Sequence, residues 1–140
     1  MPSQLIHSLA NRASELGKLE PMLEQWRQHF QLSDSVVYNL NLTLEELLTN
    51  TIHYGYPDKS ESNIILKVCC ENQTLLVTIE DEAIPFDPLN VKDPDLTSDI
   101  FHRPVGGLGV YLVKKLMNCV QYQREGNKNI VSLGLRLASA

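Results

Sequence analysis

The chain has 140 residues, of which 43% are hydrophobic, and 12 Lys and Arg against 17 Asp and Glu give a formal net charge of −5. This length suits one compact domain with a single core, so we expect residues 1–140 to form one domain. The acidic balance argues against a surface that follows nucleic-acid phosphates, and direct nucleic-acid binding is not expected.

The N-terminal segment has no basic region followed by an apolar core, as a signal peptide would have. No apolar run approaches the roughly 20 residues needed to span a bilayer, so no membrane contact is expected. The cysteines Cys69, Cys70 and Cys119 form no C-x-x-C pair and indicate reduced thiols rather than a zinc or redox site. We therefore expect a cytoplasmic protein.

Two amphipathic helices are predicted in the first part of the chain. From Leu9 to Phe30, apolar residues recur at steps of three and four, the spacing of one helical stripe. A second stripe begins after Ser33-Asp34, a candidate N-cap, and runs to Ile52. It ends near Tyr54-Gly55-Tyr56-Pro57, where glycine and proline interrupt the pattern.

The periodicity then changes to that of strands. Ile64–Val68 and Leu75–Ile79 are short and rich in β-branched residues, and Glu71-Asn72-Gln73 between them predicts a hairpin turn. Asp81–Val105 contains four prolines and several acids, so we expect a long loop there. Loops of this length in compact domains are usually functional lids or disordered segments.

A third helix and two more strands complete the predicted order. Helical spacing of apolar residues returns after Gly109, and strands are expected around Val120–Arg124 and Ile130–Leu137. Helices that are kept apart from hairpins favour an α+β fold over a doubly wound parallel sheet. We predict a two-layer α/β sandwich, with a mixed, mostly antiparallel sheet covered on one face by helices.

Glu46 and Asn50 lie one turn apart in the second predicted helix, so their side chains share one face. A carboxylate and an amide oxygen in this arrangement can serve as a proton acceptor and as a ligand of a hard cation. A solvated polar face is the alternative explanation for such a pair.

The segment Asp81-Glu82-Ala83-Ile84-Pro85-Phe86-Asp87-Pro88 follows directly from a predicted strand. An aspartate at a strand end can accept a hydrogen bond from an exocyclic amine such as that of adenine. A turn made of turn-forming residues is the alternative.

Gly106-Gly107-Leu108-Gly109 opens the third predicted helix. Glycines let the backbone approach an anion closely, and the helix N-terminus supplies free N–H groups and a positive dipole end. The pattern indicates a phosphate site, with a glycine-rich helix cap as the alternative. It matches neither the Walker A loop nor the dinucleotide fingerprint, which needs a glycine where Leu112 stands.

Together these motifs resemble the ATP-binding superfamily shared by gyrase, the histidine kinases and the anti-sigma-factor serine/threonine kinases (the Bergerat fold). The resemblance covers about Val36 to Leu137. It rests on Glu46-x-x-x-Asn50 with Tyr54-Gly55-Tyr56, on Asp81-x-Ala83-x-Pro85-Phe86-Asp87-Pro88, and on Gly106-Gly107-Leu108-Gly109-Val110-Tyr111-Leu112-Val113. The Pro-Phe-Asp-Pro sequence resembles the anti-sigma-factor (RsbW-like) branch, since a histidine kinase would carry a second glycine where Pro85 stands.

The resemblance implies a site for ATP and Mg²⁺. It makes Asn50 the magnesium ligand, Glu46 the carboxylate that activates the substrate hydroxyl, and Asp81 the residue that recognises the adenine amino group. The other nucleotide-binding positions that it implies are Ala83, Arg103, Gly106, Gly107, Leu108 and Gly109. Arg103 would face the terminal phosphate, and an ATP lid is expected around residues 83–105.

Ala83 departs from the family pattern, which has glycine two residues after the aspartate. The added methyl group fits if φ at this residue is negative. If φ must be positive, we expect strain of about 1 kcal/mol.

The resemblance implies an ATP-dependent serine/threonine protein kinase that phosphorylates an anti-sigma-factor antagonist and sequesters a sigma factor. A homodimer is compatible with it. One alternative is a non-catalytic module that binds ATP to gate a protein–protein interaction, against which the presence of Glu46 argues. Another is a domain that keeps the fold but has lost ATP binding, for which Ala83 is the only support.

Overall fold

The computed structural model describes residues 4–89 and 107–137. The elements are, in chain order, β1 (Gln4–Ala10), the 3₁₀ helix η1 (Ala13–Lys18), α1 (Leu19–Phe30), α2 (Asp34–Tyr54), β2 (Asn63–Glu71), β3 (Thr74–Asp81), α3 (Gly107–Leu116), β4 (Cys119–Glu125) and β5 (Lys128–Arg136). The strands form one five-stranded sheet in the order β1-β2-β3-β5-β4, and every pairing among them is antiparallel.

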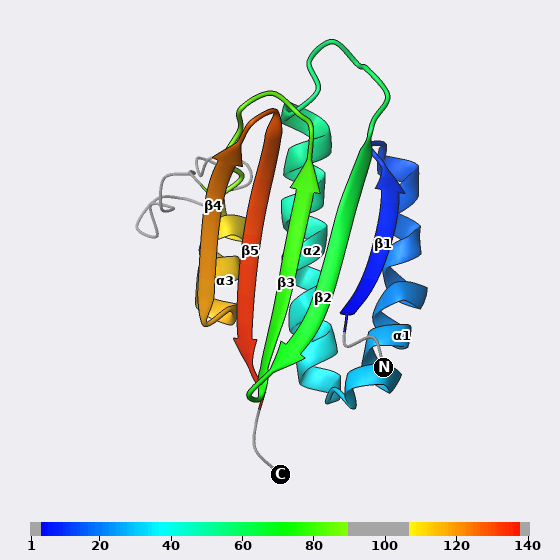
Figure 1. The fold of residues 1–140 in the computed structure, drawn as a ribbon, viewed down its shortest axis with the longest axis vertical. Helices are drawn as coiled ribbons and strands as arrows, with labels where there is room; N and C mark the ends of the chain where they lie inside the picture. Colours follow the sequence, from blue (N-terminus) through cyan, green and yellow to red (C-terminus); the bar gives the residue numbers. More distant parts are fainter. Residues whose placement is uncertain (1–3, 90–106, 138–140) are drawn as a thin grey trace.

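The three α-helices cover one face of this sheet (Figure 1). In the view shown, α1 lies behind the β1 edge, α2 crosses behind the middle strands and α3 lies behind β4 and β5. The predicted α+β fold with helices on one face is therefore confirmed. None of the helices in the described part of the chain is long and apolar enough to cross a bilayer.

Strand β1 is a difference from the sequence prediction, which placed a helix from Leu9 onward. The strand pairs with β2 along its whole length, with Leu5 opposite Val68 and Leu9 opposite Ile64. Leu9 is buried at the end of this strand, whereas the helix α1 begins only at Leu19. A local period cannot reveal this strand, because its partner lies more than 50 residues away in the sequence.

Both predicted hairpins are confirmed. The turn between β2 and β3 consists of Asn72 and Gln73, which both have positive φ, at 50° and 65°. These angles match a type I′ turn, whose twist suits a two-residue hairpin. The turn between β4 and β5 contains Gly126 at φ 61°.

Helix α2 is the element that positions the candidate site. Its N-cap is Ser33, as predicted, and the Ser33 hydroxyl accepts a hydrogen bond from the Val36 N–H at 3.3 Å. One side of the helix is fully buried in the core through Leu40, Leu44, Leu47 and Leu48. Each buried leucine contributes about 1.5–3 kcal/mol of hydrophobic stabilisation, so the orientation of α2 is firmly set.

Candidate functional site

Glu46 and Asn50 share one face of α2, as their spacing predicts. The Asn50 amide nitrogen donates a hydrogen bond to Glu46 Oε1 at 3.3 Å. Asn50 is 9% exposed and Glu46 is half-buried, so this face is not a simple solvated one. The bond uses the nitrogen of the Asn50 amide, and no described residue donates to its Oδ1, which remains available to a cation.

Helix α3 brings Gly109 against Glu46. A Cβ added at residue 109 would overlap the carboxylate of Glu46. Glycine therefore lets the Glu46 carboxylate keep this position against the first turn of α3, and a larger residue would have to displace that carboxylate. Two motifs that are more than 60 residues apart in the sequence meet here.

The rest of the predicted glycine loop is only partly described. Gly107 and Leu108 are the first residues of α3, which places the start of that helix at the loop, as predicted. Gly106 and Arg103 lie outside the described residues, as does most of the predicted lid.

Asp81 is the last residue of β3 and is only 5% exposed. Its Oδ1 accepts hydrogen bonds from the Ala83 N–H and from the Asn129 amide, both at 3.0 Å. Burial raises the pKa of Asp81 above its ordinary value, although these two hydrogen bonds and the charge of Arg124 oppose the rise. No described residue donates to Oδ2, so this oxygen can accept a hydrogen bond from a ligand.

Ala83 is accommodated by its contact with Gly55, the C-cap of α2. Ala83 is 2% exposed and does not have positive φ, so the backbone strain considered above does not arise. A Cβ added at Gly55 would lie 2.8 Å from the Ala83 Cβ, and the Ile84 N–H donates to the Gly55 carbonyl at 3.0 Å. The methyl group of Ala83 thus fills space that Gly55 leaves open.

Asn129 on β5 is a candidate site residue that sequence reasoning missed. It is 2% exposed, and its amide nitrogen donates to Asp81 Oδ1 at 3.0 Å and to the Ile84 carbonyl at 2.8 Å. Its Oδ1 accepts hydrogen bonds from the Tyr122 hydroxyl at 2.5 Å, from Arg124 Nη1 at 3.1 Å and from the Phe86 N–H at 3.4 Å. This saturated amide holds Asp81 in one orientation.

Arg124 on β4 extends the same network to the segment after Asp81. Its Nη1 donates to the Ala83 carbonyl at 2.9 Å as well as to Asn129. Arg124, Tyr122 and Asn129 all lie on the more buried face of the last two strands, the face that also carries hydrophobic residues such as Val120 and Val131. Polar residues in such positions were the signal in the sequence that could have identified this network.

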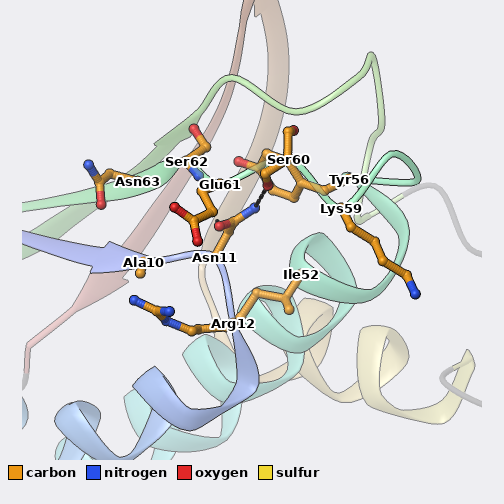
Figure 2. Close-up of a pocket in the computed structure, with 10 residues that line it drawn as sticks. All are labelled: Ala10, Asn11, Arg12, Ile52, Tyr56, Lys59, Ser60, Glu61, Ser62 and Asn63. Atoms are coloured by element: carbon orange, nitrogen blue, oxygen red, sulfur yellow. Dashed lines mark hydrogen bonds between the residues drawn. The ribbon is translucent and has the colours of Figure 1, made fainter.

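A cavity of the described structure lies beside this site rather than in it. It has a volume of about 450 Å³ and is lined by residues at the end of β1 and α2 and in the loop before β2, as Figure 2 shows. The Asn11 side chain crosses it to the Ser60 carbonyl at 2.8 Å. None of the predicted nucleotide-binding residues lines this cavity, so we do not assign ATP to it.

Tyr56 lies between the two regions. Its side chain lines the cavity, and its hydroxyl is buried. Burial raises the pKa of Tyr56, and the negative charge of Asp81 raises it further. The tyrosine thus lines the cavity and lies near enough to Asp81 to be affected by its charge.

A family model for the histidine kinase-like ATPase domain matches residues 9–135. The chain belongs to this family. The match covers both the α2 pair and the Asp81–Asn129 network, and it confirms the superfamily that the motifs resemble. The roles of the individual residues stay predictions.

Several kinases are similar to this ATPase domain. The serine/threonine-protein kinase BtrW of Bordetella bronchiseptica is 24% identical over 112 residues, which cover 77% of this chain and 79% of BtrW. The serine-protein kinase RsbW of Bacillus thuringiensis is 24% identical over 99 residues, which cover 68% of this chain and 61% of RsbW.

Solved structures show the same fold. The RsbU and RsbW domains of Rv1364c from Mycobacterium tuberculosis superpose with a TM-score of 0.68 at 13% identity, covering 98% of this chain and 33% of that one. The Acinetobacter baumannii histidine kinase AdeS gives a TM-score of 0.53 at 19% identity, covering 96% of this chain and 68% of AdeS.

Proposed function

We propose that this chain is an ATP-dependent serine/threonine protein kinase that acts as an anti-sigma regulatory factor. The observation that supports it best is that Glu46, hydrogen-bonded to Asn50, lies against Gly109 at the start of α3. This arrangement suits phosphoryl transfer, because it places a carboxylate, an amide oxygen and the N–H groups of a helix N-terminus close together. The kinase names of the relatives RsbW and BtrW support the same reaction class.

In this proposal Asp81 recognises the adenine ring. Its Oδ2 accepts a hydrogen bond from the exocyclic amine, while Asn129 holds Oδ1. Guanine carries a carbonyl oxygen at the same ring position, and an ionised carboxylate would repel it. The site would therefore favour ATP over GTP because a mismatched polar group would remain buried without a partner.

Asn50 would hold Mg²⁺ through its Oδ1. Amide oxygen is a hard ligand of the kind that Mg²⁺ prefers, so the residue fits this ion. Within residues 4–89 and 107–137, no group of three or more His, Cys, Asp or Glu side chains could enclose a metal. The other ligands would be phosphate oxygens and water, and bound MgATP would supply a phosphoryl group whose charge the metal neutralises.

Glu46 would accept the proton of a serine or threonine hydroxyl on the partner protein. The hydrogen bond from Asn50 orients its carboxylate, and Gly109 allows α3 to approach it. Residues 83–105 would form the lid, with Arg103, Gly106, Gly107 and Leu108 beside the phosphates. We further propose, from the resemblance to RsbW-like kinases, that the substrate is an anti-sigma-factor antagonist, that a sigma factor is sequestered and that the chain forms a homodimer.

The test is transfer of labelled γ-phosphate from ATP to a small antagonist protein that co-purifies with the chain. Glu46→Gln should abolish transfer and keep ATP binding within about twofold, because the substitution removes the base and little volume. Asn50→Ala should lose magnesium-dependent ATP binding. Transfer at the wild-type rate by Glu46→Gln would contradict the assignment of the base, and ATP binding without any transfer would favour the non-catalytic module.

A further inference from the structure

A second groove lies between α1 and α2, and none of the proposed nucleotide-binding residues lines it. It has a volume of about 540 Å³. Its floor is apolar, since Leu19 and Leu23 are each 2% exposed and the partly buried Leu16 and Val37 flank them. Leu19 and Leu23 lie beneath the floor, so the partly buried Leu16 and Val37 supply the apolar surface that a partner can reach.

The walls of this α1–α2 groove are acidic. They carry Glu20, Glu24, Asp34 and Glu45, with Arg27 as the one basic side chain that lines it. Arg27 Nε pairs with Glu24 at 3.0 Å, and its Nη1 pairs with Asp34. Glu20 and Glu45 make no ion pair with any described residue, so the groove keeps uncompensated negative charge on both walls.

An exposed aromatic side chain stands on the rim of the groove. Tyr38 on α2 lines it and is 62% exposed. Leu42, one turn further along α2, is 38% exposed. Tyrosine is among the residue types that most often anchor a partner protein at an interface.

The shape and charge of the groove point to one kind of occupant. Along α2 its lining runs from Asp34 to Glu45, which corresponds to about 16 Å, or about three turns of a facing helix. We propose that the α1–α2 groove binds an amphipathic helix of a partner protein, with leucine-like residues on the floor and Lys or Arg against the acidic walls.

A second copy of this chain fits the groove less well than a basic partner. Helices α1 and α2 line the groove with their own acids, so two copies of this surface would repel each other. Helix α3 has basic residues only in its last turn, at Lys114 and Lys115. The proposal does not depend on ATP or on phosphoryl transfer, because no residue of the nucleotide site takes part.

The test uses two synthetic peptides of about five helical turns. One carries a leucine stripe with lysine flanks, and the other carries the same stripe with glutamate flanks. Fluorescence anisotropy of the labelled peptides at about 0.15 M salt, where long-range attraction is screened, reports binding to the full chain. Only the lysine peptide should bind.

The decisive variant is Glu20→Lys combined with Glu45→Lys, which should lower the affinity for the lysine peptide by at least about tenfold. The matched control is Glu71→Lys combined with Glu125→Lys, since both of these acids are exposed at hairpin turns outside the groove. The control should change affinity by less than about twofold. All four positions are exposed, so both variants should melt near the wild-type temperature.

An equal loss of affinity for the lysine peptide in the two double variants would overturn the proposal, because it would show non-specific attraction of the peptide to an acidic protein. Amide shifts caused by the lysine peptide should map to α1 and α2, and shifts confined to other elements would also overturn it. Sedimentation of Tyr38→Ala supplies a third check. Loss of a dimer in that variant would show that a second copy, and not a foreign helix, occupies the groove.

Discussion

Two halves of the sheet bury polar side chains in different ways. On the β1 side, the Trp26 indole N–H donates to His7 Nε2 at 2.9 Å, and each ring nitrogen involved is satisfied by the other. On the β3–β5–β4 side, Asp81 is buried with a raised pKa and keeps one oxygen without a described donor. The hydrogen bond between Trp26 and His7 needs no ligand. Asp81, in contrast, keeps one carboxylate oxygen that can accept a hydrogen bond from a ligand.

This difference separates a structural contact from a binding site. Burying a neutral, mutually bonded pair costs little, and the pair then fixes how β1 meets α1. Burying a carboxylate costs more free energy of folding. Buried carboxylates with shifted pKa values are therefore concentrated at functional sites. Changes at four places should test this contrast, with effects that fall from the Asn129 network to the β1 side.

The largest effect is expected for Asn129→Ala. The substitution leaves Asp81, Arg124 and Tyr122 without their shared partner, so the free energy of unfolding should fall by about 3 kcal/mol. ATP affinity should fall with it. Urea denaturation and calorimetric titration measure the two quantities, and Asn127→Ala in the exposed turn is the control. Unchanged stability would mean that the network does not hold Asp81.

Gly55→Ala should come next and should lower the free energy of unfolding by about 2 kcal/mol, because the new methyl group would meet both the Thr51 carbonyl oxygen and the Ala83 methyl group. Adding Ala83→Gly to the same chain should restore part of the stability. A double-mutant cycle by urea denaturation measures the coupling between the two positions. Strictly additive effects would show that Ala83 does not occupy the space beside Gly55.

Asp81→Asn should separate stability from binding. Because burial raises the pKa of Asp81, its folded form binds more protons than its unfolded form. The contribution of Asp81 to stability is therefore present at low pH and is lost as pH rises from 3.8 through the folded pKa. At pH 7 the variant should melt no lower than wild type, yet it should bind ATP more than about tenfold more weakly. A marked drop in melting temperature would instead make Asp81 a structural residue.

The smallest effect is expected on the β1 side. Burial lowers the pKa of His7 from 6.5, so protonation favours the unfolded chain. Stability should therefore be full above pH 6.5 and should fall as pH drops through the folded pKa of His7. Melting curves between pH 5 and 8 (the range where histidine titrates) on wild type and His7→Phe isolate the effect, and an equal pH dependence in both would contradict it.

The sequence predicted the two hairpins and the central helix, because each depends on local chemistry. Turn residues, helical spacing and the Ser33 cap can be recognised within a few residues of the chain. Glu46 and Asn50 share a face for the same local reason. The edge strand β1 was missed because its stability comes from pairing with a distant strand.

What only the tertiary structure decided is which polar groups meet. The pattern of residues 119–136 identifies two strands, but it does not state that Asn129 faces Asp81 or that Arg124 reaches the Ala83 carbonyl. In the same way, Ala83 departs from the family pattern in the sequence, and only the structure shows that its methyl group lies in the space beside Gly55. Hydrogen bonds and close contacts act over about 3–4 Å, and only the folded chain brings distant residues within that range.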